Sequence, residues 1–450
     1  MPDTIAGIAT AMGEGGIAIV RISGKDATGV FNGLFRTRGH QPPYPDHLLM
    51  HGTVADAEGA AVAEAMGVVM YAPHTYTRED VCELHTHGGY AAASLVMDQL
   101  IRLGVRPAEP GEFTRRAFLN GRIDLAQAEA VMGIIGARSQ AALKSQEALL
   151  AGGASRFLKD AQDRLIRLIA GVEAYIDYPE EIGEDEATAS LLGGLDELSK
   201  NLHSVSDERS ARILRFGLRV ALCGTPNAGK STLFNALLSE ERAIVTDIPG
   251  TTRDVLEGSF SLNGFQVQLL DTAGIRPSDN VVEQIGVQRA RQVLSTADAA
   301  LLLIDATKPL DGEELALLHM RLQCPCAVLL NKEDKPPVLT VPQIAAETEH
   351  APVISVSAKN GTGLQAILDY LYGFLAQPRE DMLTHQRHTA LARQAADKLS
   401  QALESLKDGA PLDLAAVDLR EALWLLGRIT GESVDEKLLD EIFSTFCVGK

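Results

Sequence analysis

The sequence predicts a multidomain protein with an α+β domain at the N-terminus and a discontinuous α-helical domain into which an α/β domain is inserted. Three sequence patterns predict this order. Residues 1–118 contain strand-like runs and turns, residues 119–215 and 377–450 have helical periodicity, and residues 216–376 alternate between predicted strands and helices. A chain of 450 residues is too long for one ordinary core, which agrees with several domains. Two separate helical domains are the alternative to a discontinuous one.

The bulk composition restricts the class of protein. No apolar run approaches the ~18 residues that cross a bilayer, and the N-terminus lacks a basic region, so neither a membrane span nor a secretory signal is expected. The five cysteines are odd in number and scattered, which favours a reducing, cytoplasmic location. The net charge of −19 argues against a broad nucleic-acid-binding surface, so any RNA contact is local or assisted by a partner.

In the first domain, residues 15–24, 65–73 and 80–89 are predicted strands. Within the last of these, His85 and His87 share one face, and two histidines alone make a poor metal site, so packing is the expected role.

In the helical stretch, Pro179 and the pair Gly193-Gly194 are the expected interruptions, and the acidic run 177–187 is interpreted as a solvated loop. Further along, Cys324 and Cys326 have no second cysteine pair nearby and are interpreted as the wall of a buried strand rather than a metal site.

A phosphate-binding loop is predicted where GTPNAGKS (224–231) follows an apolar strand and opens a helix. Its glycines let backbone N–H groups wrap a β-phosphate, and the helix N-terminus favours the anion. Lys230 is expected to reach the β and γ oxygens and Ser231 to bind Mg²⁺. A chance glycine turn before a helix is the alternative for this motif alone. The predicted nucleotide contacts are Asn227, Ala228, Gly229, Lys230, Ser231 and Thr232.

Two further segments match the loops that face a γ-phosphate. In PGTTRD (249–254), Thr252 is expected to complete the Mg²⁺ shell. In VQLLDTAG (267–274), Asp271 ends a strand and is suited to hold a water on Mg²⁺, and the run before it is predicted to be a hairpin with an Asn263-Gly264 turn. The predicted contacts here are Thr246, Thr251, Thr252, Asp271, Thr272, Ala273 and Gly274.

A guanine-binding motif completes the set. AVLLNKED (327–334) ends an apolar strand, and the carboxylate of Asp334 can accept from guanine N1–H and the 2-amino group, which adenine does not offer. SVSAKNG (355–361) follows as the loop near the guanine carbonyl. The predicted contacts are Asn331, Lys332, Asp334, Ser357, Ala358 and Lys359. Five motifs in order, each at a strand end, predict a Ras-like P-loop GTPase domain that binds GTP rather than ATP.

One element of that domain is missing. In Ras-like enzymes a glutamine soon after this glycine orients the attacking water. Here the next residue is Ile275, and no glutamine appears until Gln284. Because an aliphatic side chain can neither donate to water nor accept from it, another group must orient the water.

These motifs, together with the terminal FCVGK (446–450), make the whole chain resemble the MnmE/TrmE family of tRNA modification GTPases. TIAGIAT, GGIAIVRISG, HGG and PGEFTRRAFLNGRIDLAQAEAV (110–131) carry the same resemblance. The resemblance implies an N-terminal folate-binding and dimer-forming domain, a helical domain and an inserted G domain. It also implies a homodimer and a heterotetramer with an FAD-binding protein of the MnmG/GidA family, acting on the wobble uridine of tRNA.

For catalysis, the resemblance implies GTP hydrolysis when two G domains meet in the presence of potassium. Such a cation stabilises developing phosphate charge where an arginine finger otherwise would. The family's counterpart of the missing glutamine is a glutamate that matches Glu283. The alternative is that Glu283 is simply an acidic residue at the start of a helix. Arg253 and Asp254 are weaker candidates for contacts across the G-domain pair. The K⁺ ligands implied are Asn227, Thr246, Ile248 and Thr251.

The resemblance also implies a reduced folate, 5-formyl- or 5,10-methylene-tetrahydrofolate, as the one-carbon donor. Residues matching the folate-binding positions are Arg21, Glu83, Arg122 and, in the tail, Lys450. Without the resemblance, the first three would be interpreted as surface ion-pair residues. Cys447 is expected near the one-carbon chemistry, its alternatives being a prenylated or a buried thiol. The pair Arg115-Arg116 either contacts tRNA or solvates a helix.

Two other functions compete with a tRNA-modifying GTPase. A regulatory GTPase with a purely conformational output fits the five motifs equally well. A folate-dependent methyltransferase with a vestigial G domain fits poorly, since every phosphate and guanine contact is intact. Folate binding by the N-terminal domain separates the first two hypotheses.

Overall fold

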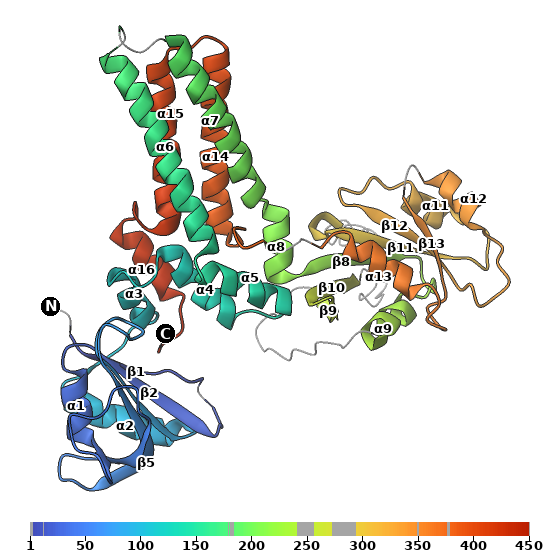
Figure 1. Ribbon diagram of the computed structural model, residues 1–450. Helices are drawn as coiled ribbons and strands as arrows, with labels where there is room; N and C mark the ends of the chain where they lie inside the picture. Colours follow the sequence, from blue (N-terminus) through green and yellow to red (C-terminus); the bar gives the residue numbers. More distant parts are fainter. Residues whose placement is uncertain are drawn as a thin grey trace, which may run out of the picture. The chain divides into compact units, whose positions relative to one another are not determined.

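The computed structural model describes residues 3–11, 13–178, 180, 184–240, 256–271, 294–348, 351–375 and 379–449 (Figure 1). The chain divides into two compact units, of which one comprises residues 1–132, 150–199 and 394–450 and the other residues 133–149 and 200–393. The second unit is therefore inserted in the first, which confirms the discontinuous organisation. The domain limits at 118, 215 and 376 stay predictions.

The N-terminal domain is built on a seven-stranded sheet. Its strands are β1 (Ile5–Ile8), β2 (Ile17–Ser23), β3 (Phe35–Thr37), β4 (Met50–Ala55), β5 (Ala61–Met70), β6 (Val81–His87) and β7 (Arg106–Pro107). Its helices are α1 (Ala27–Leu34), α2 (Tyr90–Arg102) and α3 (Glu112–Leu119). The order β3-β4-β5-β6-β2-β1-β7 is antiparallel except for the β1–β7 pair. The predicted strands 15–24, 65–73 and 80–89 correspond to β2, β5 and β6.

Strict alternation along β2 separates the two faces of this sheet. Ala18, Val20 and Ile22 are buried in the core together with residues of α1 and α2. The intervening Arg21 lies on the opposite face, where its register partner on β6 is Glu83. The alternation therefore places these two charged side chains next to each other on the face away from the core.

A helical bundle forms the rest of the first unit. Its members are α6 (Gly153–Asp177), α7 (Glu184–Val205), α14 (Gln386–Lys407) and α15 (Leu412–Thr430), which run side by side (Figure 1). The shorter helices of this unit are α4 (Leu125–Ile135) and α16 (Glu436–Ser444), whereas α5 (Gln140–Leu150) and α8 (Glu208–Phe216) belong to the second unit. Ser199 of α7 and Ser400 of α14, 2.8 Å apart between hydroxyl oxygens, join the two segments that the insertion separates.

The expectation that Gly193-Gly194 interrupts a helix is wrong, because both glycines lie inside α7. A Cβ atom at Gly194 would come within 2.8 Å of the Leu168 side chain on α6. Glycine here allows two helices to approach closely, and the packing offsets its low helix propensity. Pro179 lies outside the described residues, as does much of the acidic run 177–187.

The second unit contains a six-stranded sheet. Its strands are β8 (Leu218–Gly224), β9 (Leu256–Leu262), β10 (Phe265–Asp271), β11 (Ala299–Asp305), β12 (Cys326–Asn331) and β13 (Val353–Val356). The helices are α9 (Lys230–Glu240), α11 (Gly312–Leu318), α12 (Val341–Glu347) and α13 (Leu364–Tyr372). The order is β13-β12-β11-β8-β10-β9, parallel except for β9. The β9–β10 turn consists of Asn263 and Gly264, both at positive φ, as the sequence predicts.

Within the described part of the chain, no helix has the length and apolarity to span a membrane.

Candidate functional site

The carboxyl ends of the parallel strands meet at one edge of the second sheet. Gly224 ends β8, Asp305 ends β11 and Asn331 ends β12; Asp305 is in register with Asn331, and Gly224 is in register with Leu303, two residues before the end of β11. Asp271 likewise ends β10. Ligands of parallel α/β sheets bind at this edge, so the topology brings the predicted phosphate and guanine loops together.

The predicted phosphate loop lies between β8 and α9. Lys230, nearly buried, donates from Nζ to the carbonyls of Gly224 (2.7 Å) and Thr225 (3.0 Å). Asn227 has φ of +65° and Gly229 has φ of +105°, so the backbone curls as a loop around an anion requires. A Cβ atom at Gly229 would collide with the Asn331 amide, so glycine is needed there on two grounds. Ala228 is buried in the loop, and Ser231 and Thr232 are exposed in the first turn of α9.

Asn331 connects the phosphate loop with the guanine motif. It is 2% exposed, and its Nδ2 donates to the Ala228 carbonyl at 2.8 Å. Its Oδ1 accepts from the backbone N–H of Ala358 at 3.0 Å. The amide therefore joins three loops of distant sequence, and with both groups satisfied it is costly to replace.

Asp334 presents its carboxylate beside the last loop. Ser357 donates from Oγ to Asp334 Oδ1 at 2.8 Å, and this hydrogen bond keeps the pKa of Asp334 below its ordinary value. The group is thus an acceptor at neutral pH, as recognition of guanine's two donors requires. Lys332, at positive φ, pairs through Nζ with Asp305 at 2.5 Å, and Lys359 is exposed on the 355–361 loop.

Several predicted residues lie outside the described part of the chain. The backbone of Asp271 is described as the end of β10, but nothing is described of its side chain. The undescribed residues are Thr246, Ile248, Thr251, Thr252, Arg253, Asp254, Thr272, Ala273, Gly274, Ile275, Glu283, Gln284 and Lys450.

A second cluster lies on the face of the first sheet that is turned away from its hydrophobic core. Arg21 Nε donates to Glu83 Oε1 at 2.8 Å, and His85 Nε2 lies 3.0 Å from Glu83 Oε2. Burial alone would raise the pKa of Glu83, but the hydrogen bonds from His85 and Arg21 outweigh it and the pKa is lowered. Both partners of the Arg21–Glu83 pair are about one-sixth exposed, so the alternative of ordinary surface ion-pair residues does not hold for them.

Aromatic rings surround this ion pair. The Arg21 guanidinium lies 5.4 Å from the centroid of Tyr76 and 5.7 Å from that of Phe113. Arg122 lies over the same Tyr76 ring at 4.8 Å. The structure thus brings together Arg21, Glu83 and Arg122, which the sequence analysis singled out. It adds Tyr76, Phe113 and His85. Of these, only His85 was considered in the sequence, as a packing residue that shares a strand face with His87.

The C-terminal tail reaches this cluster. Arg21 Nη1 donates to the Gly449 carbonyl at 3.4 Å, and Gly449, at positive φ, packs so closely on Ile8 that a Cβ atom would collide with it. Phe443 and Phe446 anchor the tail in a buried apolar cluster. The exposed Cys447 accepts at its carbonyl from the Gly111 N–H at 3.3 Å. Its exposure excludes the buried-thiol alternative.

Comparison with known proteins identifies the family. A model of the GTP-binding protein TrmE N-terminus matches residues 4–122, and a model of the MnmE helical domain matches residues 125–447. The tRNA modification GTPase MnmE of Carboxydothermus hydrogenoformans is 40% identical, with all of both chains covered. That of Symbiobacterium thermophilum is 43% identical, covering 100% of this chain and 99% of the relative. The chain belongs to the MnmE/TrmE family.

Membership of the MnmE/TrmE family confirms the resemblance seen in the motifs, and the chain is a GTPase of this family. Among solved structures, Era of Aquifex aeolicus bound to GDP and AlF4⁻ matches 39% of this chain and 66% of its own at 27% identity. Its TM-score of 0.29 is too low to support an argument.

Arg115 and Arg116 form ion pairs within this MnmE-family chain, and their contact with tRNA stays a prediction. Arg116 is 11% exposed and pairs with Asp3 (2.8 Å), Glu112 (3.0 Å) and Glu79 (3.1 Å). Arg115 pairs with Asp440 of α16 at 3.0 Å. Both guanidinium groups therefore hold the folded unit together.

The expectations for the histidines and for the cysteine pair are confirmed only in part. His87 lies 3.4 Å from Glu64, whereas His85 belongs to the Glu83 cluster rather than to simple packing. Burial raises the pKa of both Cys324 and Cys326, as suits the wall of a strand. No group of metal-binding side chains was found among the described residues.

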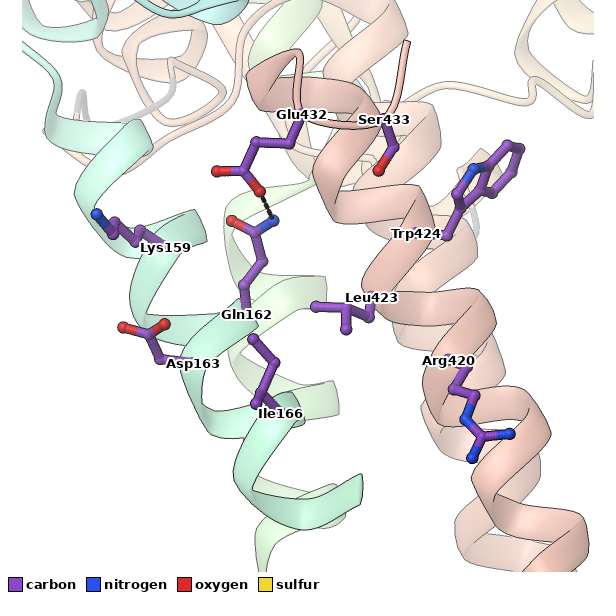
Figure 2. Close-up of a pocket in the computed structure, with 9 residues that line it drawn as sticks. All are labelled: Lys159, Gln162, Asp163, Ile166, Arg420, Leu423, Trp424, Glu432 and Ser433. Carbon is purple, nitrogen blue, oxygen red and sulfur yellow. Dashed lines mark hydrogen bonds between the residues drawn. The ribbon is translucent and has the colours of Figure 1, made fainter. Parts of the chain in front are cut away.

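A groove of about 370 Å³ opens between α6 and α15 (Figure 2). Gln162 donates to Glu432 at 2.8 Å within it. Trp424, the single tryptophan of the sequence, lines the groove and is half exposed, with the Arg428 guanidinium 4.8 Å from its ring. No residue that the sequence analysis singled out lines this groove.

Proposed function

We propose that this chain hydrolyses GTP in a potassium-stimulated reaction that requires two G domains to meet. It acts as a homodimer with an FAD-binding partner of the MnmG/GidA family. The complex forms the 5-carboxymethylaminomethyl or aminomethyl group on the wobble uridine of tRNA, with a tetrahydrofolate derivative as one-carbon donor. The relatives named tRNA modification GTPase MnmE support the proposal, as does the arrangement of both residue clusters.

The nucleotide cluster supports GTP as the substrate. Lys230 lies in the phosphate loop and Asn331 joins that loop to the guanine motif, so both ends of a nucleotide can be held at once. Ser231 and Thr252 would hold Mg²⁺, which neutralises charge on the phosphates when bound. Asn227 with Thr246, Ile248 and Thr251 would hold K⁺, and Glu283 would orient water.

The second cluster has the chemistry of a reduced-folate site. Tyr76 offers an aromatic face beside two guanidinium groups, suited to a flat heterocycle and a carboxylate tail. Glu83 uses one lone pair on each oxygen toward Arg21 and His85, and the others can accept from ring N–H groups. The tail contacts this cluster through Gly449, and we include Cys447 and Lys450, which flank that residue in the sequence, as ligand contacts.

One observation favours tRNA modification over a purely conformational switch. Arg21, Glu83 and Arg122 converge on Tyr76, and the C-terminal tail closes against Arg21. A switch needs only the nucleotide site, whereas this second cluster has the donors and acceptors of a small-molecule site.

The proposal predicts that Arg21→Ala weakens the binding of 5-formyl-tetrahydrofolate to the full-length chain. The variant loses a charged donor, and we expect a dissociation constant about 10 to 100 times larger, from roughly 1.5–3 kcal/mol for a hydrogen bond to a charged group. Isothermal titration calorimetry measures the constant, and GTP affinity should stay unchanged.

Arg36→Ala provides the matched control, because Arg36 is an exposed arginine on β3 of the same sheet. It should bind the folate as the unmodified chain does. A full-length chain that hydrolyses GTP but binds no reduced folate would instead favour the regulatory GTPase.

A further inference from the structure

A fully buried carboxylate lies next to the phosphate loop. Glu314, in the first turn of α11, is 0% exposed, although charged residues are rarely buried so completely without partners. A buried carboxylate is costly unless its oxygens accept hydrogen bonds, so the partners of Glu314 indicate its role.

One oxygen of Glu314 caps its own helix. Oε2 accepts from the Asp311 N–H at 3.3 Å, while Asp311 Oδ1 accepts from the Glu314 N–H at 2.9 Å. This reciprocal pair is a capping box, in which glutamine serves as well as glutamate. The other capping box described in the same unit uses exposed Gln343 with Thr340 at the start of α12. Capping alone therefore explains neither the charge nor the burial of Glu314.

The other oxygen of Glu314 reaches the phosphate loop. Oε1 accepts from Thr225 Oγ1 at 3.2 Å and lies 3.2 Å from Lys308 Nζ. Thr225 directly follows Gly224, and the carbonyls of these two residues receive the hydrogen bonds of Lys230 Nζ. The hydroxyl contact therefore holds the residue whose carbonyl orients the phosphate-binding lysine.

We propose that Glu314 is a positioning residue for nucleotide binding, acting through the Thr225 hydroxyl on the first turn of the phosphate loop. Without this contact the nucleotide must order the loop when it binds. The free energy spent on ordering the loop weakens the affinity for the nucleotide. The inference rests on GTP binding at residues 224–231 and adds a buried support that reaches the loop from α11.

The first test is Thr225→Val, which removes the hydroxyl and keeps the shape. We expect the dissociation constants of fluorescent GDP and GTP analogues to rise about tenfold, as for the loss of one hydrogen bond to a charged group. KM for GTP should change more than kcat, because the contact orders the loop rather than the reacting water. Thr225→Ser should restore the affinity to within about twofold, since serine keeps the hydroxyl.

A double-mutant cycle then examines the contact itself. Glu314→Gln keeps a side chain that suits the capping box but removes the charge, and should weaken nucleotide binding as Thr225→Val does. The double variant should be no weaker than the weaker single variant, because both remove one interaction. Thr340→Val is the matched control: it removes a capping hydroxyl in the same unit and should leave nucleotide affinity unchanged.

Unchanged affinity in Thr225→Val, failure of Thr225→Ser to restore it, or fully additive effects in the cycle would overturn the inference. Lys230→Ala serves as the reference for the site itself. If Lys230→Ala still binds GTP normally, the phosphate loop is not the nucleotide site and the proposed function fails separately.

Discussion

GTP turnover by the full-length chain is expected to rise about tenfold or more when potassium replaces sodium, and Asn227→Ala should abolish this stimulation. The effect is large because, in the proposed mechanism, the cation takes the place of an arginine finger, which is worth ~10³–10⁵ in rate in other GTPases. Asn227 lies at positive φ in the phosphate loop with an exposed side chain, so its amide oxygen is accessible to a cation. Steady-state phosphate release in the two salts measures the effect.

Glu283→Ala belongs to the same experiment. It should lower turnover by about 100-fold, the typical contribution of a positioned acid–base group, while nucleotide affinity stays intact. Glu313→Ala removes an exposed glutamate of α11 and is the matched control with unchanged turnover. Equal rates in sodium and potassium would contradict the cation mechanism and favour a switch activated by another protein.

Asp334→Asn is expected to reverse nucleotide preference. In the proposed site the Asp334 carboxylate accepts from guanine N1–H and the 2-amino group. An asparagine amide in its place can donate to the carbonyl that xanthine carries where guanine has the 2-amino group. Two charged hydrogen bonds at roughly 1.5–3 kcal/mol each predict a loss of GTP affinity of about 100-fold or more, with a gain for xanthosine triphosphate. Competition between the two triphosphates for the full-length chain measures this preference.

Asp369→Asn makes the same chemical change at an exposed aspartate of α13 and should leave the preference unaltered. If Asp334→Asn retained full GTP affinity, the 331–334 segment would not recognise the base. The Ser357–Asp334 contact predicts a smaller effect in the same direction for Ser357→Ala, since the serine only holds the carboxylate.

The nucleotide loops could be predicted from sequence because their chemistry is local. A strand, a glycine-rich turn and a helix start are contiguous in residues 218–240, and they form β8, the loop and α9 as predicted. The Asn263-Gly264 turn was predictable for the same reason, since both residues tolerate positive φ. Strand ends of a parallel sheet meet at one edge, so the order of the motifs implied a common site.

Other features depended on partners that are distant in the sequence. Arginine is a residue type that usually lies on the surface, but the fold surrounds Arg116 with Asp3, Glu79 and Glu112. The Gly193-Gly194 pair has the pattern of a break, but Leu168 of another helix makes glycine fit there. The residue type determines which hydrogen bonds a side chain can form, whereas the packing of the fold determines which partner it meets.

The sequence by itself indicated GTP as the nucleotide, through motifs whose function depends on a few adjacent residues. Only the tertiary structure decided what surrounds Arg21 and Thr225. Gly449 lies 428 residues from Arg21 along the chain, and Glu314 lies 89 residues from Thr225. No local sequence pattern encodes such pairs. Bringing distant segments together loses conformational entropy, and the burial of whole hydrophobic cores offsets that loss, whereas a single contact does not.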